Sequence, residues 1–208
     1  MNDLIKKIKS MKNTRLSIEI DNRIKDFENF QSKPSRSWFS ELCFCILTAN
    51  SSAESGIKAQ KSINDENLCS YPFEKLRESL KSTGYRFYNK RAEYIIKNQK
   101  YCKNLKEIIT NLGDSIKRRD WLVDNVIGLG YKESSHFLRN IGFKDIAIID
   151  RHIINILYEN DYIKDKKINR KRYIKYENIL RAIAEYCNMD LARLDLYLWY
   201  IETHKVLK

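Results

Sequence analysis

Lys132 is the residue whose type and position in the sequence could do chemistry. It lies two residues after Gly130, and the apolar spacing that follows predicts a helix over residues 131–140, so Lys132 falls in the first turn. The helix dipole disfavours a cation there, and together with partial burial it would lower the pKa of the amine. An uncharged lysine amine is a nucleophile that forms Schiff bases, whereas the plain alternative is a solvated surface lysine.

Gly128 and Gly130 predict a tight turn between two helices. Residues 115–125, which precede them, also show helical spacing. Glycines accept backbone angles that a Cβ penalises, so the Gly-Leu-Gly stretch favours an αα-hairpin. The first N–H groups of the second helix would point outward and suit a phosphate, which gives affinity for nucleic acid without a choice of base. An ordinary αα-corner is the alternative, because Gly-x-Gly alone is a weak signal.

Asp150 marks the start of the next predicted helix. It lies eighteen residues after Lys132, directly behind the short apolar run Ala147-Ile148-Ile149, and residues 151–160 after it have helical spacing. Aspartate is a preferred N-cap, so we expect Asp150 to cap that helix. Capping alone would account for an aspartate at this position.

The hairpin, Lys132 and Asp150 together resemble the helix-hairpin-helix DNA glycosylase superfamily. That superfamily is defined by this hairpin, by a Gly/Pro-rich segment, here reduced to Gly142-Phe143, and by the aspartate. The stretch GYKESSHFLRNIGFKDIAIIDRHI is similar, more narrowly, to the short archaeal-type branch of 8-oxoguanine DNA glycosylase/AP lyases. The similarity extends over nearly the whole chain.

The resemblance implies a bifunctional repair enzyme that acts on 8-oxoguanine in double-stranded DNA. Neutral Lys132 would attack C1′ of the flipped nucleotide, expel the base and leave a Schiff base, from which β-elimination cleaves the strand. Asp150 would stabilise positive charge on C1′ and assist proton movement. Two alternatives remain open. One is a glycosylase for oxidised or mispaired pyrimidines with the same Lys/Asp pair, and the other is a non-enzymatic helix-hairpin-helix DNA-binding module, which needs neither residue.

The resemblance also implies DNA contacts by Asn50 and His152, in addition to Gly128 and Gly130. Asn50 follows a buried helix, at the place from which the superfamily inserts a Gln or Asn into the space left by the extruded base. His152 fits an Asp-x-His pattern that places a histidine against a phosphate near the target nucleotide. A helix-terminating asparagine and a surface histidine are the respective alternatives.

Four residues are expected to recognise the base: Phe87, His136, Trp199 and Lys208. Phe87 lies among aromatics interleaved with Arg and Lys, a mixture that suits base stacking but also a core turn. His136 lies one helical turn after Lys132 on the same face, where it could line the base pocket or only pack. In the archaeal-type branch the terminal lysine reaches the pocket, and a carboxylate there would favour the N7–H of 8-oxoguanine over guanine. Trp199 would be the stacking wall; sequence alone would make Lys208 a frayed tail.

The elements that position these residues are predicted to be helices. With 6 Gly and 2 Pro in 208 residues, the chain has too few turn residues for an all-β protein. We expect an all-α fold, a single domain of two helical lobes with the hairpin and a base-binding cleft between them. One lobe would comprise about residues 52–136, and the other about residues 1–51 plus 137–208. Residues 38–49 are apolar on all sides, so their helix should be buried.

The net charge of +12 suggests a polyanionic partner, although charge alone discriminates poorly. The sequence has no run of eighteen apolar residues, and its charged N-terminus is unlike a signal peptide. We therefore expect a cytoplasmic protein that associates with the nucleoid through DNA. It would have no membrane segment and act as a monomer.

The cysteines and histidines argue against a bound metal. Five cysteines form no CxxC pair, and we expect them to be reduced and mostly buried: Cys43, Cys45, Cys69, Cys102 and Cys187. Relatives that resemble endonuclease III hold an iron–sulfur cluster with four closely spaced C-terminal cysteines, whereas this chain has only Cys187 there. The three histidines show no metal-site spacing. We expect no metal and no diffusible cofactor, with the hairpin carbonyls as candidate ligands of a monovalent cation.

Overall fold

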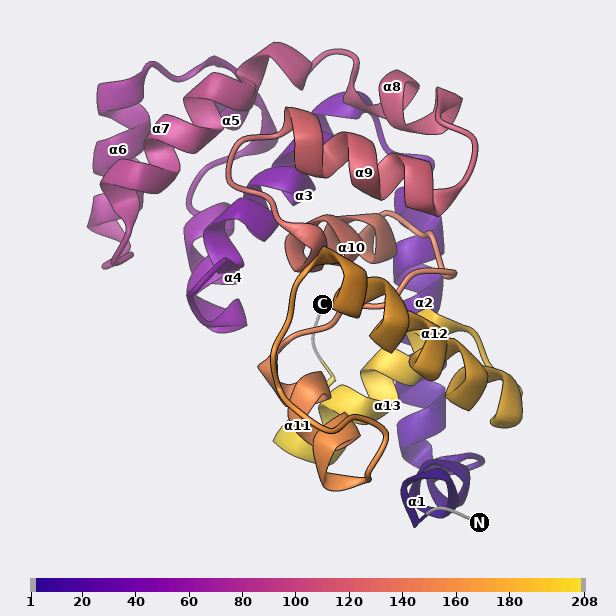
Figure 1. Cartoon of the computed structure of the whole chain (residues 1–208). Coiled ribbons are helices and arrows are strands. Elements are labelled where there is room, and N and C mark those ends of the chain that lie inside the picture. Colours follow the sequence, from indigo (N-terminus) through magenta and orange to yellow (C-terminus); the bar gives the residue numbers. More distant parts are fainter. Residues whose placement is uncertain (1–2, 207–208) are drawn as a thin grey trace. The chain divides into compact units, whose positions relative to one another are not determined.

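The computed structural model describes residues 3–206, and all regular secondary structure in this range is helical (Figure 1). The prediction of an all-α fold is therefore confirmed. The chain divides into two compact units. Unit 1 contains the described residues up to Gln31 and from Leu138 onward, and unit 2 is Ser32–Phe137. No helix within the described range is both long and apolar enough to cross a membrane.

Unit 2 is built around helix α3 (Ser35–Thr48). Its side chains from Trp38 to Thr48 are all buried, as its continuous apolar surface predicts. Helices α4, α5, α7 and α8 pack against it, and α6 packs against α7. The bounds of the other elements that lie wholly in unit 2 are α4 (Ala53–Lys61), α5 (Asp65–Ser70), α6 (Phe73–Ser82), α7 (Tyr88–Asn98), the 3-10 helix η1 (Gln99–Tyr101), α8 (Leu105–Asn111) and α9 (Ser115–Asn125).

Unit 1 is organised around the C-terminal helix α13 (Leu191–Thr203). It packs against α2 (Arg15–Phe30), α11 (Arg151–Glu159) and α12 (Arg170–Tyr186). Burial of branched apolar side chains drives this association, since α11 alone buries three isoleucines and a leucine. Helix α1 (Asp3–Met11) precedes α2.

Helix α10 (Tyr131–Asn140) begins in unit 2 and ends in unit 1. After it, residues 141–150 run to α11 without regular secondary structure, although most of their side chains are buried. This connecting segment ends at Asp150. The two units therefore divide the candidate catalytic residues, with Lys132 in unit 2 and Asp150 in unit 1.

The boundary between the units differs from the expected lobes at one of its two ends. The expected lobe of residues 52–136 excluded α3, whereas unit 2 starts at Ser32 and includes it. The reason is that α3 is the helix on which four other helices of unit 2 pack. At the other end, the boundary after Phe137 lies one residue from the expected position.

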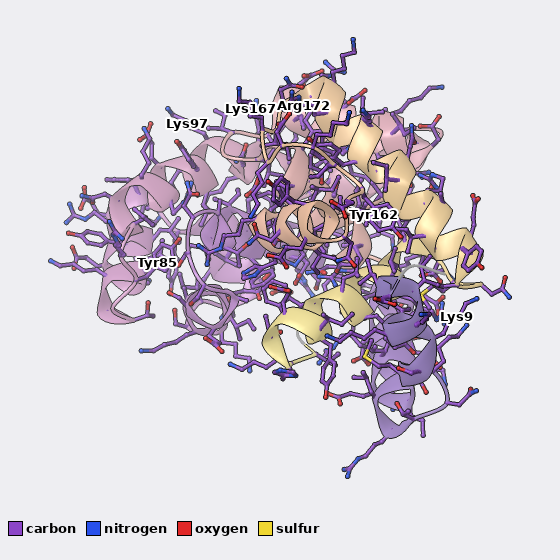
Figure 2. The ribbon with its side chains drawn as sticks, turned by 60° about the horizontal axis from the view of Figure 1, so that its bottom comes forward. Lys9, Tyr85, Lys97, Tyr162, Lys167 and Arg172 are labelled. Carbon is purple, nitrogen blue, oxygen red and sulfur yellow. A yellow bond between two sulfur atoms is a disulfide. The ribbon has the colours of Figure 1, made fainter. Side chains whose placement is uncertain are left out.

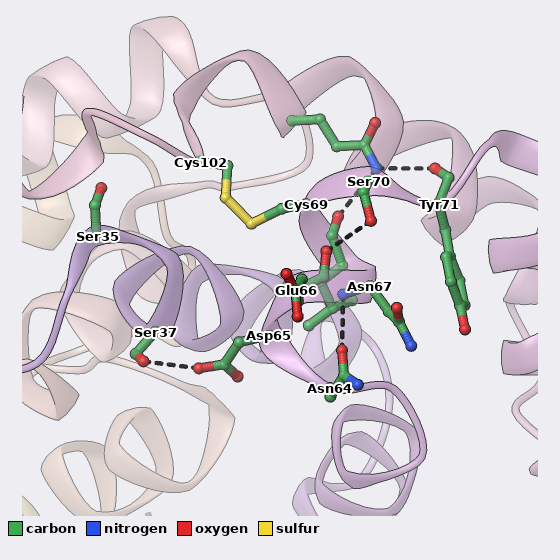
Figure 3. The surroundings of a disulfide bond; sticks show 12 residues. Ser35, Ser37, Asn64, Asp65, Glu66, Asn67, Cys69, Ser70, Tyr71 and Cys102 are labelled. Carbon is green, nitrogen blue, oxygen red and sulfur yellow. Dashed lines mark hydrogen bonds between the residues drawn. A yellow bond between two sulfur atoms is a disulfide. The ribbon is translucent and has the colours of Figure 1, made fainter.

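Two of the five cysteines form a disulfide, so the expectation that all were reduced is wrong. Cys69 in the last turn of α5 is bonded to Cys102 just after η1, with their Cα atoms 5.7 Å apart (Figure 3). The pair is separated by 33 residues and comes together because α5 packs beside η1. Cys43, Cys45 and Cys187 are buried thiols outside the disulfide, as expected, and burial raises the pKa of the Cys43 thiol well above its usual value.

Candidate functional site

The predicted hairpin joins α9 to α10 and depends on glycine at position 128. Gly128 has φ +95°, in the left-handed region that other residues rarely adopt. A Cβ built on Gly128 would also lie 2.5 Å from Cδ2 of the Tyr94 ring, so the glycine is needed for space as well. Leu129 is buried in the turn, whereas Ile127 at its tip is exposed. The hairpin is thus a compact turn with its tip open to solvent.

Side chains of α7 and η1 contact the backbone of the hairpin, which the sequence did not predict. The buried amide of Asn98 donates to the carbonyl of Ile127 (2.8 Å) and accepts from its N–H (3.1 Å). One turn earlier, Tyr94 lies beside Gly128, and one turn later the Tyr101 hydroxyl donates to the carbonyl of Asn125 (3.2 Å). The i, i+4 and i+7 spacing places all three side chains on one face. No local sequence signal marks that face as a support.

Lys132 lies in the first turn of α10, as predicted, and is half-buried. No described residue of unit 2 forms a hydrogen bond or ion pair with its amine, in contrast to Lys90 and Lys97, which both bind Glu93. The carboxylate of Glu133, the next residue, accepts from the Gly130 N–H (3.3 Å) at the start of the helix. Tyr131, the residue before Lys132, is fixed by a hydrogen bond that its hydroxyl donates to Asp120 (2.7 Å). The lysine is therefore held by rigid neighbours while its amine is unengaged within the unit.

Asp150 caps α11, which confirms the prediction. One carboxylate oxygen, Oδ1, accepts from the N–H groups of His152 (2.9 Å) and Ile153 (3.0 Å). The side chain is half-buried, and among the described residues of unit 1 the other oxygen, Oδ2, receives no hydrogen bond. Capping thus fixes the orientation of the carboxylate and leaves Oδ2 for another partner.

His152 and Trp199 are two predicted site residues that the structure brings together, both in unit 1. Their rings meet edge to face with centroids 5.3 Å apart, His152 from α11 and Trp199 from α13. Nδ1 of His152 also lies 3.6 Å from a carboxylate oxygen of Glu202. Both rings are partly accessible. The histidine is therefore more than an isolated surface residue, because it belongs to an aromatic and acidic cluster.

Phe87 and His136 lie in unit 2 in different surroundings. Phe87 immediately precedes α7 and is half-buried, with the guanidinium carbons of Arg86 and Arg91 at 4.9 and 5.8 Å from its ring centroid. An aromatic ring bordered by cations suits contact with a nucleic acid. His136 is buried and meets Phe44 edge to face at 5.6 Å, so this histidine packs against α3.

Asn50 stands at an exposed tip directly after α3, with φ +57°. The carbonyls that end the helix are bound by buried side chains: the hydroxyl of Tyr85 donates to Leu47 and the guanidinium of Arg91 donates to Ala49. The helix ends at Thr48 with Ala49 as its C-cap, so Asn50 lies just beyond the helix and is exposed to solvent. Lys208, the remaining predicted residue, lies outside the described residues.

Basic side chains are spread over the surface of the chain, which carries a net charge of +12. Lys97 in unit 2 and Lys167 in unit 1 are exposed examples (Figure 2). Several lysines lie over aromatic rings, among them Lys90 at 5.2 Å from the Tyr94 ring, next to the hairpin. These cations suit a phosphate backbone as partner.

Comparison with known proteins gives one consistent family. A family model described as 8-oxoguanine DNA glycosylase matches residues 20–189. An 8-oxoguanine DNA glycosylase/AP lyase of Methanocaldococcus jannaschii is 52% identical over 207 residues, covering 99% of each chain. One from Korarchaeum cryptofilum is 43% identical over 210 residues, covering 100% of this chain and 99% of its own. The crystal structure of the M. jannaschii protein with a 15mer DNA containing 8-oxoguanine matches with a TM-score of 0.95, at 51% identity and 99% coverage of both chains.

Proposed function

The chain belongs to the 8-oxoguanine DNA glycosylase family, and on this premise we propose that it excises 8-oxoguanine from double-stranded DNA and cleaves the strand at the resulting abasic site. The observation that carries the proposal is the match along 99% of both chains to a solved relative with 8-oxoguanine DNA bound. Within this chain, the proposal is supported by the glycine hairpin, the unengaged amine of Lys132 and the open oxygen of Asp150.

The hairpin is proposed to grip a phosphate near the lesion. Its tip is open to solvent, and the helix that follows begins at Tyr131 with its first N–H groups directed at the turn. Gly130 donates its N–H to the carboxylate of Glu133, so an anionic oxygen is an acceptor that fits this position. We assign further DNA contacts to Asn50, which would fill the space left by the extruded base, and to His152, which would approach a phosphate.

Lys132 is proposed to be the nucleophile. The lone pair of its neutral amine attacks C1′ as the glycosidic bond breaks, and the electron pair of that bond leaves with the base, which takes up a proton. The sugar ring then opens as its oxygen takes up a proton, and the adduct becomes a Schiff base. Removal of a proton from C2′ forms the C2′–C3′ double bond and expels the 3′ phosphate, which breaks the strand.

Asp150 is proposed to assist both phases. Its negative charge would stabilise the positive charge that develops at C1′ while the base departs, and its open oxygen would accept and return the protons that move. Because Oδ1 is fixed by two backbone N–H groups, Oδ2 is the atom to which we assign this role.

Recognition of the lesion is assigned to the four predicted residues. Phe87 and Trp199 would stack on the flipped base, and His136 would line the pocket through its contact with Phe44. Lys208 is assigned to telling 8-oxoguanine from guanine, through the N7–H that the lesion has and guanine lacks. The chemistry needs only an amine and a carboxylate, so we propose that no diffusible cofactor takes part and that any monovalent cation at the hairpin carbonyls is structural. We place the enzyme, as a monomer, in the cytoplasm on nucleoid DNA.

A panel of lesions tests this function. The protein is incubated with duplex oligonucleotides that carry 8-oxoguanine, an oxidised pyrimidine, a mispaired pyrimidine or guanine at one position, and strand cleavage and borohydride-trapped adduct are measured. We expect both products chiefly with 8-oxoguanine. Products confined to a pyrimidine lesion would identify that lesion as the substrate in place of 8-oxoguanine. Binding without any product would mean that the protein is a non-enzymatic DNA-binding module.

A further inference from the structure

The backbone that leads to Asp150 is held by two side chains of α12. The segment Ala147–Ile149 is buried and lies outside regular secondary structure, so no strand within residues 3–206 bonds its N–H and C=O groups. The hydroxyl of Tyr173 takes both roles of such a strand, since it donates to the carbonyl of Ala147 (2.9 Å) and accepts from the N–H of Ile149 (3.1 Å). One turn along, the carboxylate of Glu177 accepts from the Ala147 N–H (3.0 Å).

The hydrogen bonds from Tyr173 and Glu177 to Ala147–Ile149, here called the clamp, act immediately before the candidate catalytic residue. Ile149 is the residue before Asp150, so the bond from its N–H to Tyr173 fixes the chain one residue upstream of the carboxylate. The cap on α11 fixes it downstream. Tyr173 and Glu177 are themselves buried, which restricts their own freedom. Two residues before this segment, Arg181 donates to the carbonyl of Asp145 (2.9 Å).

We propose that Tyr173, supported by Glu177, is a positioning residue that sets the direction in which Asp150 presents its open oxygen. The inference rests on the proposed function, in which that oxygen serves the reacting sugar. Loss of the Tyr173 hydroxyl leaves the Ala147 carbonyl and the Ile149 N–H buried without this partner, so the segment must shift to satisfy them. A displacement of about 1 Å at a catalytic group costs about a hundredfold in rate, so even a partial shift is measurable.

The chain offers a matched control three residues away. Tyr176 lies on the same helix, is equally buried, and its hydroxyl also bonds to backbone carbonyls, those of Asp165 (3.3 Å) and Lys167 (3.1 Å). Those carbonyls belong to the loop before α12 and not to the segment before Asp150. Tyr173→Phe and Tyr176→Phe therefore each remove one oxygen atom of the same chemical kind, and only the first removes it from the clamp.

The experiment measures the single-turnover rate of 8-oxoguanine excision, the Kd for lesion duplex and the Tm of each variant. We expect Tyr173→Phe to lower the rate by about 10- to 100-fold with Kd changed less than about twofold, and Tyr176→Phe to keep the wild-type rate at a similar loss of Tm. Equal rates in the two variants would overturn the inference. If Tyr173→Phe is too unstable to purify, Glu177→Leu removes one bond of the clamp and must show the same loss of rate at unchanged Kd.

Asp150→Asn separates failure of the inference from failure of the proposed function. If Tyr173 acts through Asp150, the double variant Tyr173→Phe/Asp150→Asn is about as slow as Asp150→Asn alone. Rate losses that multiply would mean that Tyr173 acts elsewhere, which overturns the positioning role. Wild-type excision by Asp150→Asn would instead overturn the role of Asp150, and with it the basis of the inference.

Discussion

Lys132 and Asp150 are each held in place by their own unit, yet each has a polar atom that no described residue of that unit binds. The lysine directly follows Tyr131, whose hydroxyl is bonded to Asp120, and no described residue of unit 2 pairs with its amine. Oδ1 of the aspartate caps α11, whereas Oδ2 receives no hydrogen bond from a described residue of unit 1. Within its own unit, each of the two residues therefore keeps a polar atom that can bind a substrate.

Two substitutions of Asp150 separate its capping role from its chemistry. Asparagine caps a helix about as well as aspartate, so Asp150→Asn should keep wild-type stability, whereas Asp150→Ala should lose about 1 kcal/mol. Both variants lose the charge, and we expect each to excise 8-oxoguanine at least about 100-fold more slowly while still binding the duplex. Denaturant unfolding and single-turnover excision provide the two readouts. An asparagine variant with normal turnover would reduce Asp150 to a helix cap.

Among the helices, α7 has the clearest link to DNA binding. Together with η1, it supports the hairpin backbone from Asn125 to Gly128 through Tyr94, Asn98 and Tyr101. Gly128 lies against the ring of Tyr94, and Asn98 bonds both backbone groups of Ile127, the residue before it. The phosphate grip proposed for the hairpin therefore depends on a helix that is distant from it in the sequence.

Asn98→Leu should weaken DNA binding through the hairpin. We expect Kd for duplex to rise about tenfold, equivalent to about 1.4 kcal/mol, and the dependence of binding on salt to weaken by about one phosphate contact. Gln99→Leu is the matched control, because the side-chain amide of the next residue also makes two bonds to the backbone, donating to the carbonyls of Leu68 and Tyr71 (both 3.0 Å), away from the hairpin. Should the control weaken binding equally, the effect would be one of general stability and the support of the hairpin by α7 would be unimportant.

Sequence reasoning succeeded for elements whose signals are local. The glycines at 128 and 130, the aspartate before α11 and the unbroken apolar surface of α3 each specify structure within a few residues. It missed Asn98, Tyr173 and the Cys69–Cys102 pair, because each joins segments that only the folded chain brings together. The compact unit that begins at Ser32 also includes α3, which the expected lobe of residues 52–136 left out, since packing decides to which unit a buried helix belongs.

Over the whole molecule, the two units differ in how the chain is constrained. Unit 2 is one continuous stretch from Ser32 to Phe137 and carries the disulfide, whereas unit 1 combines the two ends of the chain. A bond that closes a loop of 33 residues stabilises a fold mainly by restricting the unfolded chain. Such bonds are rare in reduced compartments. The sequence did not point to this one, because its five cysteines are odd in number and form no CxxC pair.

The disulfide should contribute stability and not activity. We expect Cys69→Ser/Cys102→Ser to lower the free energy of unfolding by about 2–5 kcal/mol while the excision rate at 25 °C stays at the wild-type value. Urea unfolding with and without reductant measures the first effect. Reductant should destabilise the wild type and leave the double variant unchanged; a reductant effect that persists in the variant would assign it to another group.

Borohydride trapping measures directly whether Lys132 forms a covalent bond with the damaged nucleotide. Wild-type protein and Lys132→Gln are each incubated with a duplex that contains 8-oxoguanine, reduced with borohydride and digested, and the adducted peptide is identified by mass spectrometry. We expect an adduct on Lys132 in the wild type and, in Lys132→Gln, neither adduct nor strand cleavage despite retained binding of the lesion. An adduct on a different amine, or trapping that persists in the variant, would show that Lys132 is not the nucleophile.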